Sequence, residues 1–188
     1  MAPQLSEDEI DDLIYLSRTG ENDELVQELT ALAEREKVTV AEILVAAKDQ
    51  GNKSTTLHMA AGNGHLETVR KLTGYFEERP KGEKQAFLDD VNEHGNTGLH
   101  WAALGGHLDM VKLLMANGAL PALANERNYV PLDLAYFNHH TDVANYFLSQ
   151  TKGMEDKNQE EGLKDAVASV DIKDDDTKAE DGDAAKSS

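Results

Sequence analysis

TTLHMAAGNGHLETVRKL at residues 55–72 and TGLHWAALGGHLDMVKLL at residues 97–114 are two copies of one pattern. Each copy has T-x-L-H, a pair of alanines and G-H-L, followed by an acidic residue, a valine and a basic residue. A short unit that recurs along a chain builds a solenoid, because one unit cannot bury its apolar face without a neighbour. The apolar residues in both copies recur at helical spacing, so we predict an all-α fold of stacked helix pairs.

The T-x-L-H and G-H-L elements resemble the ankyrin repeat, a unit of about 33 residues that forms a β-turn and two helices. Aligned on the first-helix leucine, Leu99 and Leu132 lie one such period apart, whereas the intervals from Leu13 to Leu57 and from Leu57 to Leu99 are longer. We predict an ankyrin-repeat domain over 1–150, a solenoid of about four repeats. Their approximate bounds are 6–50, 51–91, 92–124 and 125–150.

The first two repeats carry insertions that have helical signals of their own. Thr39-Val-Ala-Glu42 is a capping box, which predicts a short helix around 39–48. The second insertion is broken at Pro80, and we predict a short helix after it that ends at Phe87 or Leu88. These helices account for the additional length without disturbing the repeat pattern.

Local residue choices also suit the helix ends of the repeats. Thr55 and Thr97 stand where a side-chain oxygen can cap a helix N-terminus. Gly64 and Gly106 fall in the tight turn between the paired helices, where a positive φ is expected. The fourth repeat has His139 at the corresponding position, which is consistent with a terminal cap that departs from the pattern.

The chain is strongly acidic, with 18 basic and 36 acidic residues among 188 and a formal net charge of −18. Nucleic acids and anionic membranes are bound through Lys and Arg, so we expect no direct contact with either. There is no cysteine, no basic and apolar leader at the N-terminus, and no apolar run near the ~20 residues of a membrane span. These features predict a soluble intracellular protein, monomeric by itself, that attracts basic polypeptides.

The two ends of the chain hold most of the negative charge. Residues 1–50 have a net charge of −9, residues 51–150 of −3 and residues 151–188 of −6. The segment 151–188 is rich in Asp, Lys, Ser, Ala and Gly and has no aromatic residue, so we predict a disordered acidic tail. Leu163, Val167 and Val170 form a weak amphipathic pattern within this tail. This short segment is therefore a candidate for docking on another surface.

Neither a metal centre nor a catalytic site is predicted. Among the seven histidines, His58 and His100 belong to the L-H motif and His65 and His107 to the G-H motif, all structural positions of the repeat. No zinc-binding pattern, P-loop, dinucleotide fingerprint or G-x-S-x-G motif occurs. We therefore expect no enzyme activity, no cofactor and no metal.

The ankyrin resemblance implies that partners bind the concave side, which is formed by the finger tips and the first helices. The position after the L-H histidine is occupied in successive repeats by Tyr15, Met59, Trp101 and Leu134, an apolar ladder along this side. The predicted partner-binding residues are Tyr15, Arg18, Asn52, Met59, Asn63, Glu93, His94, Asn96, Trp101, Leu104, Glu126, Arg127, Tyr129 and Phe137.

The apolar ladder and the acids at the start of the first helix each have an alternative, purely structural interpretation. Met59 and Leu134 suit packing between repeats as well as partner contact. For Tyr15 and Trp101 we favour partner contact, because aromatic residues are enriched at interface hot spots. The acids of 7–12 either complement the dipole of the first helix or attract a basic partner.

The stretch LHMAAGNGHLETVR, the insertion after it and GNTGLHWAALGGHLDMVKLL resemble the fungal ankyrin-repeat chaperones of small-subunit ribosomal protein three. The similarity covers about residues 6–150 and is strongest at 55–72 and 92–114. The pairing of LHMAA with LHWA, the insertion of about nine residues and the acidic first repeat make the match more specific than a generic ankyrin signature.

This resemblance implies a dedicated chaperone that binds a basic ribosomal protein and needs no nucleotide. It would keep the client soluble until pre-ribosomes take it up, which places the protein in the cytoplasm and the nucleus. Charge alone leaves other basic clients open, histones among them. A scaffold or an inhibitor of a regulatory protein is the alternative from a different class.

Deletion of residues 152–188 is expected to leave the repeat domain intact, because the tail cannot bury enough apolar surface to contribute to the core. The measurement is thermal unfolding of the full-length and shortened chains by circular dichroism. A shift of the midpoint by more than about two degrees would show that the tail docks on the repeats.

Overall fold

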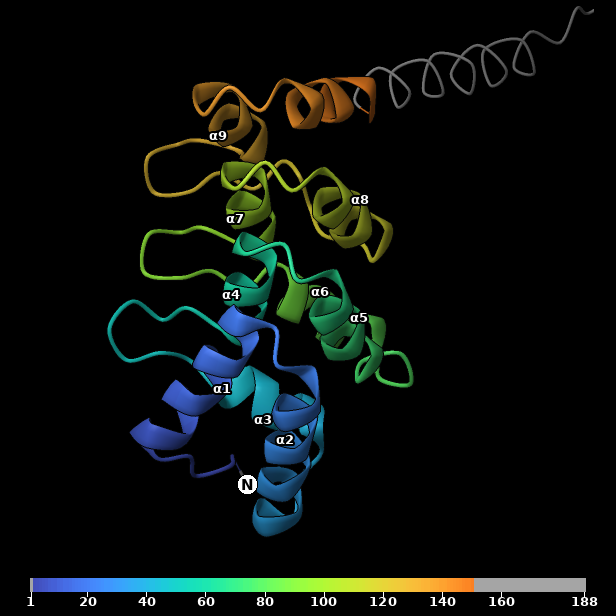
Figure 1. Cartoon of the computed structure of the whole chain (residues 1–188). Helices are drawn as coiled ribbons and strands as arrows, with labels where there is room; N and C mark the ends of the chain where they lie inside the picture. The colour runs from blue at the N-terminus through green and yellow to red at the C-terminus, as the bar shows by residue number, and fades with distance from the viewer. Residues whose placement is uncertain (1, 151–188) are drawn as a thin grey trace, which may run out of the picture. The chain divides into compact units, whose positions relative to one another are not determined.

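The computed structural model describes residues 2–150 and shows helix pairs stacked along one direction (Figure 1). This confirms the predicted all-α ankyrin solenoid; the predicted tail lies outside the described residues. A further helix runs from 141 to 150, the last residue described. The others are α1 (Glu7–Thr19), α2 (Asn22–Glu36), α3 (Val40–Ala46), α4 (Thr56–Gly62), α5 (Leu66–Gly74), α6 (Lys81–Leu88), α7 (Gly98–Leu104), α8 (Leu108–Ala116) and α9 (Pro131–Phe137).

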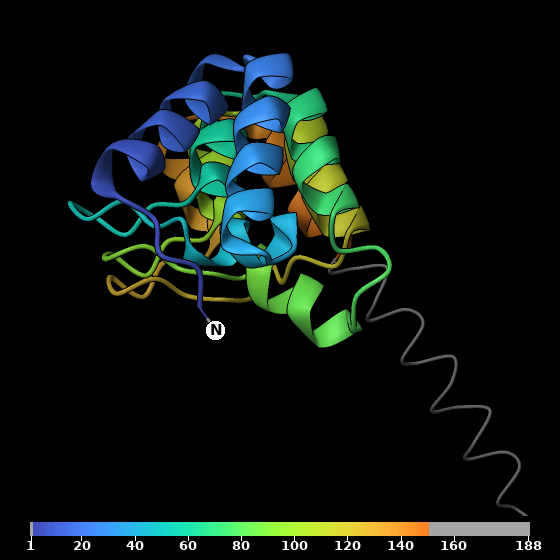
Figure 2. The same cartoon turned by 90° about the horizontal axis from the view of Figure 1, so that it is seen from below.

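The first helices of the pairs, α1, α4, α7 and α9, lie side by side, and the loops that precede α4, α7 and α9 project from them as fingers (Figures 1 and 2). The second helices α2, α5 and α8 form the outer layer. None of the helices within residues 2–150 combines the length and the apolar character that a membrane span requires. We refer to the side of the stack formed by the fingers and the first helices as the groove.

Both insertion helices form where the sequence predicts them. The hydroxyl of Thr39 accepts from the backbone N–H of Glu42, and the Glu42 carboxylate accepts from the backbone N–H of Thr39 at 2.8 Å, which starts α3. Helix α6 begins directly after Pro80. Its Phe87 ring stacks on Phe76 with centroids 4.5 Å apart, so the second insertion adds to the core.

The turn glycines carry the predicted positive φ, and the structure shows a second reason for them. Gly64 has φ +75° and Gly106 has φ +72°. A Cβ on Gly64 would lie 2.8 Å from the ring of His107, and one on Gly106 would lie 2.4 Å from the ring of His140. Each glycine thus admits a histidine of the next repeat, and each of these rings donates from Nε2 to a carbonyl of the preceding repeat, at 3.0 Å.

The histidines of the L-H motif connect each repeat to the next finger. Nδ1 of His58 accepts from the backbone N–H of Thr55 at 3.1 Å, so Nε2 carries the proton and donates to the carbonyl of Asn96 at 2.8 Å. His100 repeats the arrangement with Thr97 and with the carbonyl of Tyr129, at 3.1 Å for each bond. Neighbouring repeats are therefore held in register by neutral imidazole rings.

Both histidines are buried between neighbouring repeats. Burial lowers the pKa of His58 and of His100 below the usual value of an exposed histidine, because the charged ring would lose its hydration. The folded chain consequently resists protonation at these two positions, and the unfolded chain does not.

Acidification from pH 7.5 to pH 5.5 is expected to lower the free energy of unfolding. Below about pH 6.5 the unfolded chain takes up protons on His58 and His100 while the folded rings stay neutral, so protonation favours unfolding. Each ring can contribute up to ~1.4 kcal/mol per pH unit in that window. Urea unfolding at a series of pH values measures this loss.

The controls are His58→Asn and His100→Asn, which are expected to be less stable at pH 7.5 but to lose less on acidification. An unfolding free energy of the unmodified chain that is equal at pH 7.5 and pH 5.5 would contradict buried neutral rings.

Candidate partner-binding groove

The ladder of residues after the L-H histidine does not present one uniform surface. Tyr15 is 58% exposed, whereas Met59 is only 6% exposed. Met59 packs with Ile10 and Ile14 of α1, so at this position the structure favours packing between repeats over partner contact. Tyr15 has the same register but no preceding repeat to pack on, which explains its exposure.

The exposure of Trp101 lies between that of Tyr15 and that of Met59. Its indole is half-buried and packs over Gly62 of the preceding repeat, where an added Cβ would lie 3.1 Å from Cε3 of the ring. The indole N–H is buried and has no hydrogen-bond acceptor among the described residues. One side of Trp101 is therefore structural, while the other borders a cavity.

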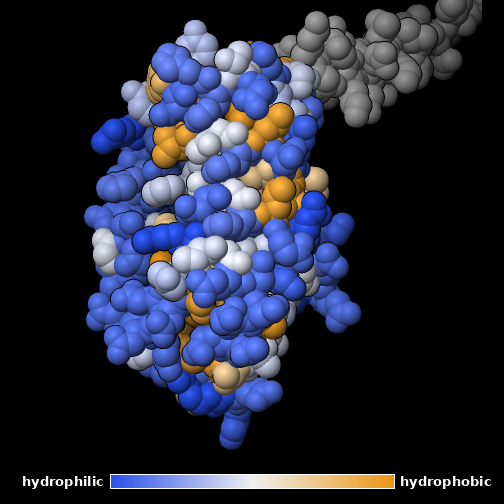
Figure 3. Space-filling model, viewed as in Figure 1, coloured by the Kyte–Doolittle hydropathy of each residue, from blue (hydrophilic) through white to orange (hydrophobic). Residues whose placement is uncertain are grey.

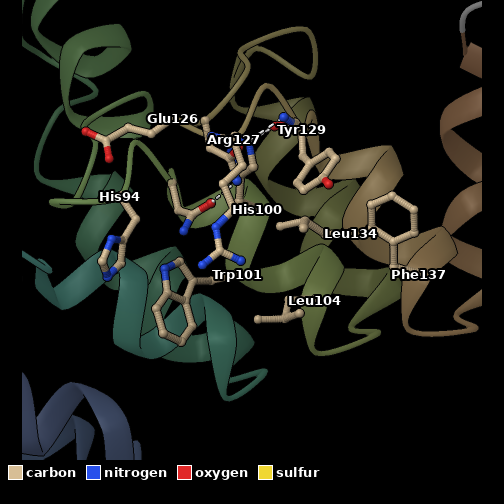
Figure 4. A pocket seen from close by; sticks show the side chains of 11 residues that line it. His94, His100, Trp101, Leu104, Glu126, Arg127, Tyr129, Leu134 and Phe137 are labelled. Atoms are coloured by element: carbon tan, nitrogen blue, oxygen red, sulfur yellow. Dashed lines mark hydrogen bonds between the residues drawn. The ribbon is translucent and has the colours of Figure 1, made fainter.

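This cavity has a volume of about 430 Å³ and lies between the third and fourth repeats (Figure 4). Helices α7 and α9 and the last two fingers contribute its walls. Its lining residues are His94, Asn96, His100, Trp101, Leu104, Asn125, Glu126, Arg127, Tyr129, Leu134 and Phe137. Aromatic and aliphatic side chains dominate one side, and the polar finger residues form the other.

Interactions between repeats hold the walls in place. Tyr129 and Phe137 meet edge to face with ring centroids 5.0 Å apart. Asn125 Nδ2 donates to Asn96 Oδ1 at 2.8 Å, which joins the two fingers. With the bond from His100 to the Tyr129 carbonyl, these contacts give a preformed apolar pocket, the usual kind of site for an anchoring side chain.

Eight of the predicted partner-binding residues line this pocket: His94, Asn96, Trp101, Leu104, Glu126, Arg127, Tyr129 and Phe137. The prediction did not include His100, Asn125 and Leu134. His100 was assigned to the repeat architecture, and Leu134 was recognised only as a ladder position. Asn125 stands one repeat period after Asn92, so the repeat alignment itself could have indicated it.

The remaining six lie elsewhere on the groove. Arg18 is exposed at the end of α1, with its Nη2 atom 3.4 Å from the Met59 sulfur. Asn63 Nδ2 donates to the Met59 carbonyl at 2.8 Å and so caps α4. The Glu93 backbone N–H donates to the Asn52 carbonyl at 2.7 Å, which joins the first two fingers. The backbone roles of Asn52 and Glu93 are structural, although the Glu93 side chain is exposed.

Charge is distributed unevenly along the groove, in agreement with the near-neutral net charge of residues 51–150 in the sequence. Helices α4 and α7 contain no Asp, Glu, Lys or Arg, and the acid and base in the last finger, Glu126 and Arg127, balance. Helix α1 holds the largest group of acids among the first helices. They are Glu7, Asp8, Glu9, Asp11 and Asp12.

The physical reason is the position of α1 at the end of the stack. Helices α4 and α7 are covered on both sides by neighbours and need small apolar residues there, whereas α1 keeps one open face. By the leucine alignment α1 also starts about one turn before the other first helices, so its acidic beginning lies on the side of the fingers (Figures 1 and 2).

One of these acids has a structural partner. The Glu9 carboxylate accepts from the Arg35 guanidinium and from the backbone N–H of Ser6, which together lower the pKa of Glu9 to about 2. The Ser6 and Glu9 pair is a capping box that fixes the start of α1. The charges of Glu7, Asp8, Asp11 and Asp12 have no ion pair among the described residues.

The exposed surface seen from the side of Figure 1 is largely hydrophilic, with small separate apolar patches (Figure 3). Within residues 2–150 no group of three His, Asp or Glu side chains is arranged to hold a metal ion. The groove therefore offers shape, apolar anchoring and charge to a partner.

Comparison with known proteins agrees with this description. The family model for ankyrin repeats in three copies matches residues 13–121 and 81–161. The ankyrin repeat-containing protein Yar1 of Saccharomyces cerevisiae is 34% identical over 170 residues, covering 89% of this chain and 82% of Yar1. Human NUDT12, an NAD-capped RNA hydrolase, is 31% identical over 99 residues but only 20% of its length is covered.

Among solved structures, the crystal structure of yeast Rps3 in complex with its chaperone Yar1 contains a matching chain. The TM-score is 0.71 at 35% identity, with 78% of this chain and 95% of the matched chain covered. The match to NUDT12 covers 53% of this chain and is restricted to the ankyrin repeats, so the hydrolase activity of NUDT12 does not carry over to this chain.

Met59→Ala is expected to lower the free energy of unfolding by about 2–3 kcal/mol, because the side chain is buried between the first two repeats. Phe137→Ala, at a side chain that is 55% exposed, is expected to cost less than about 1 kcal/mol. Urea unfolding followed by circular dichroism compares the two. Equal losses would mean that Phe137 is part of the core and not a free wall of the pocket.

Proposed function

Because this chain belongs to the Yar1 family of ankyrin-repeat proteins, we propose that it is a dedicated chaperone of the small-subunit ribosomal protein Rps3. The protein binds this basic client without a nucleotide and keeps it soluble until it joins the pre-ribosome. The observation that carries the proposal is the match to Yar1 along nearly the whole of both chains, in a fold that has been solved with Rps3 bound to its chaperone.

The geometry of the groove suits this role. A rigid stack presents an extended surface whose elements are held by hydrogen bonds between repeats, so little ordering is needed on binding. The pocket at Trp101 offers an apolar anchor, and the net charge of −18 attracts a basic chain and speeds its capture. Covering the positive surface of the client prevents its aggregation and its non-specific binding to RNA.

Release of the client follows from the same chemistry. The sequence has no nucleotide-binding motif, so nucleotide hydrolysis does not drive release. A competitor with higher negative charge density, such as ribosomal RNA, can take over the basic surface that the chaperone covers. We further propose that the protein acts in both the cytoplasm and the nucleus, since ribosomal proteins are made in the first and assembled in the second.

Trp101→Ala is expected to weaken binding of full-length Rps3 at least tenfold, because the substitution removes the central aromatic wall of the pocket. Isothermal titration calorimetry measures the Kd, and circular dichroism checks that helicity is nearly unchanged. Addition of ATP or GTP is expected to leave the Kd as it is.

Trp101→Phe and Leu120→Ala serve as controls. The first keeps an aromatic ring without the unsatisfied N–H, and the second removes an exposed apolar side chain that does not line the pocket. Both are expected to bind within about threefold of the unmodified chain, well inside one factor of ten. Failure of the unmodified protein to bind Rps3, or to keep it soluble on co-expression, would refute the proposed function.

A further inference from the structure

We propose that the groove is polarised and orients its client. In this arrangement an apolar side chain of the client occupies the pocket between repeats three and four, and a cationic segment of the same polypeptide lies on α1. The inference rests on the proposed function, because a basic ribosomal protein supplies both chemistries in one chain.

The pocket end is built for an uncharged anchor. Trp101, Leu104 and Phe137 line it, and its only Asp, Glu, Lys or Arg residues are Glu126 and Arg127, whose charges cancel. A lysine or arginine side chain placed there would give up hydration without a net counter-charge, which is costly in an apolar site. An aliphatic or aromatic side chain gains from the same surroundings.

The α1 end has the opposite character. Tyr15 lies in a shallow hollow of about 420 Å³ between α1 and α2, together with Asp12, Glu24 and Glu28. An exposed tyrosine ring beside carboxylates favours a Lys or Arg side chain, whose stem packs on the ring while its charge meets the acids. Asp8 and Asp11, which are exposed and have no ion pair within residues 2–150, extend the negative surface along α1, whose one cation, Arg18, stands at its last turn.

Between the two ends, helices α4 and α7 contain no ionised side chain, and the exposed Lys53 and Glu93 on the first two fingers have opposite charges. Electrostatic attraction of a cationic segment therefore has its focus on α1, and apolar anchoring has its focus at the pocket. A client with one basic end and one apolar end fits in one direction only, since the reverse direction places cations in the apolar pocket.

The distance between α1 and the pocket also sets the length of the client segment that can contact both. Neighbouring helices pack about 8–10 Å apart, so α1 and the pocket beyond α7 are separated by roughly 20–25 Å. A helical client segment covers this distance in about 13–17 residues, at 1.5 Å each. An extended segment covers it in about 6–8 residues.

Cross-linking tests the orientation directly, because the sequence has no cysteine and single labels are unambiguous. Asp11→Cys and Glu126→Cys are each labelled with a benzophenone maleimide and irradiated in complex with full-length Rps3. The label at position 11 is expected to mark a Lys- and Arg-rich segment, and the label at position 126 an apolar one, at the spacing given above. Glu67→Cys on α5 is the control and is expected to give little product.

Charge neutralisation tests the same idea through kinetics. The triple variant Asp8→Asn, Asp11→Asn and Asp12→Asn is expected to slow association about tenfold at 50 mM salt. A matched variant with Glu67→Gln, Glu77→Gln and Asp109→Asn neutralises three exposed acids that are not on α1. It is expected to change the association rate less than twofold. Stopped-flow fluorescence of the single tryptophan reports both rates.

The outcomes separate this inference from the proposed function. Cross-links in the reverse order, or equal slowing by the two triple variants, would overturn the polarity while Rps3 binding stands. Absence of any complex with Rps3 would overturn both.

Discussion

The contact on which the structure depends is the hydrogen bond that crosses from one repeat to the next finger through a buried imidazole. His58 and His100 each accept from a backbone N–H within their own repeat and donate to a carbonyl of the following finger. No single repeat contains both partners. Each finger is therefore positioned by the repeat before it, and the groove exists only as a property of the stack.

The same interlocking restricts what the interior of the groove can contain. Ala60, Ala61, Ala102 and Ala103 are buried where first helices approach closely, which leaves little room for charged side chains. Charged or large aromatic side chains occur where a first helix lacks a covering neighbour, on α1 and at the interface between the third and fourth repeats. An aromatic pocket at one end and an acidic helix at the other are the two places where this chain can distinguish one partner from another.

The insertions add buried side chains to the core and contribute no residue to the pocket between the third and fourth repeats. The stacked rings of Phe76 and Phe87 close the core beside the second repeat. Lys48 reaches from the first insertion to Asp90, with Nζ 2.7 Å from the carboxylate. These contacts connect the insertions to the first two repeats, whose lengths depart most from the common period.

The repeat architecture, both insertion helices, the capping role of Thr97 and the turn glycines were predictable from the sequence, because these depend on local patterns of a few residues. The sequence also indicated most of the pocket through the fingers and the ladder. The burial of Met59 and the packing of Trp101 on Gly62 became apparent only in the folded chain. Exposure at equivalent repeat positions depends on whether a neighbour covers them, and a repeat pattern read along one chain does not contain that information.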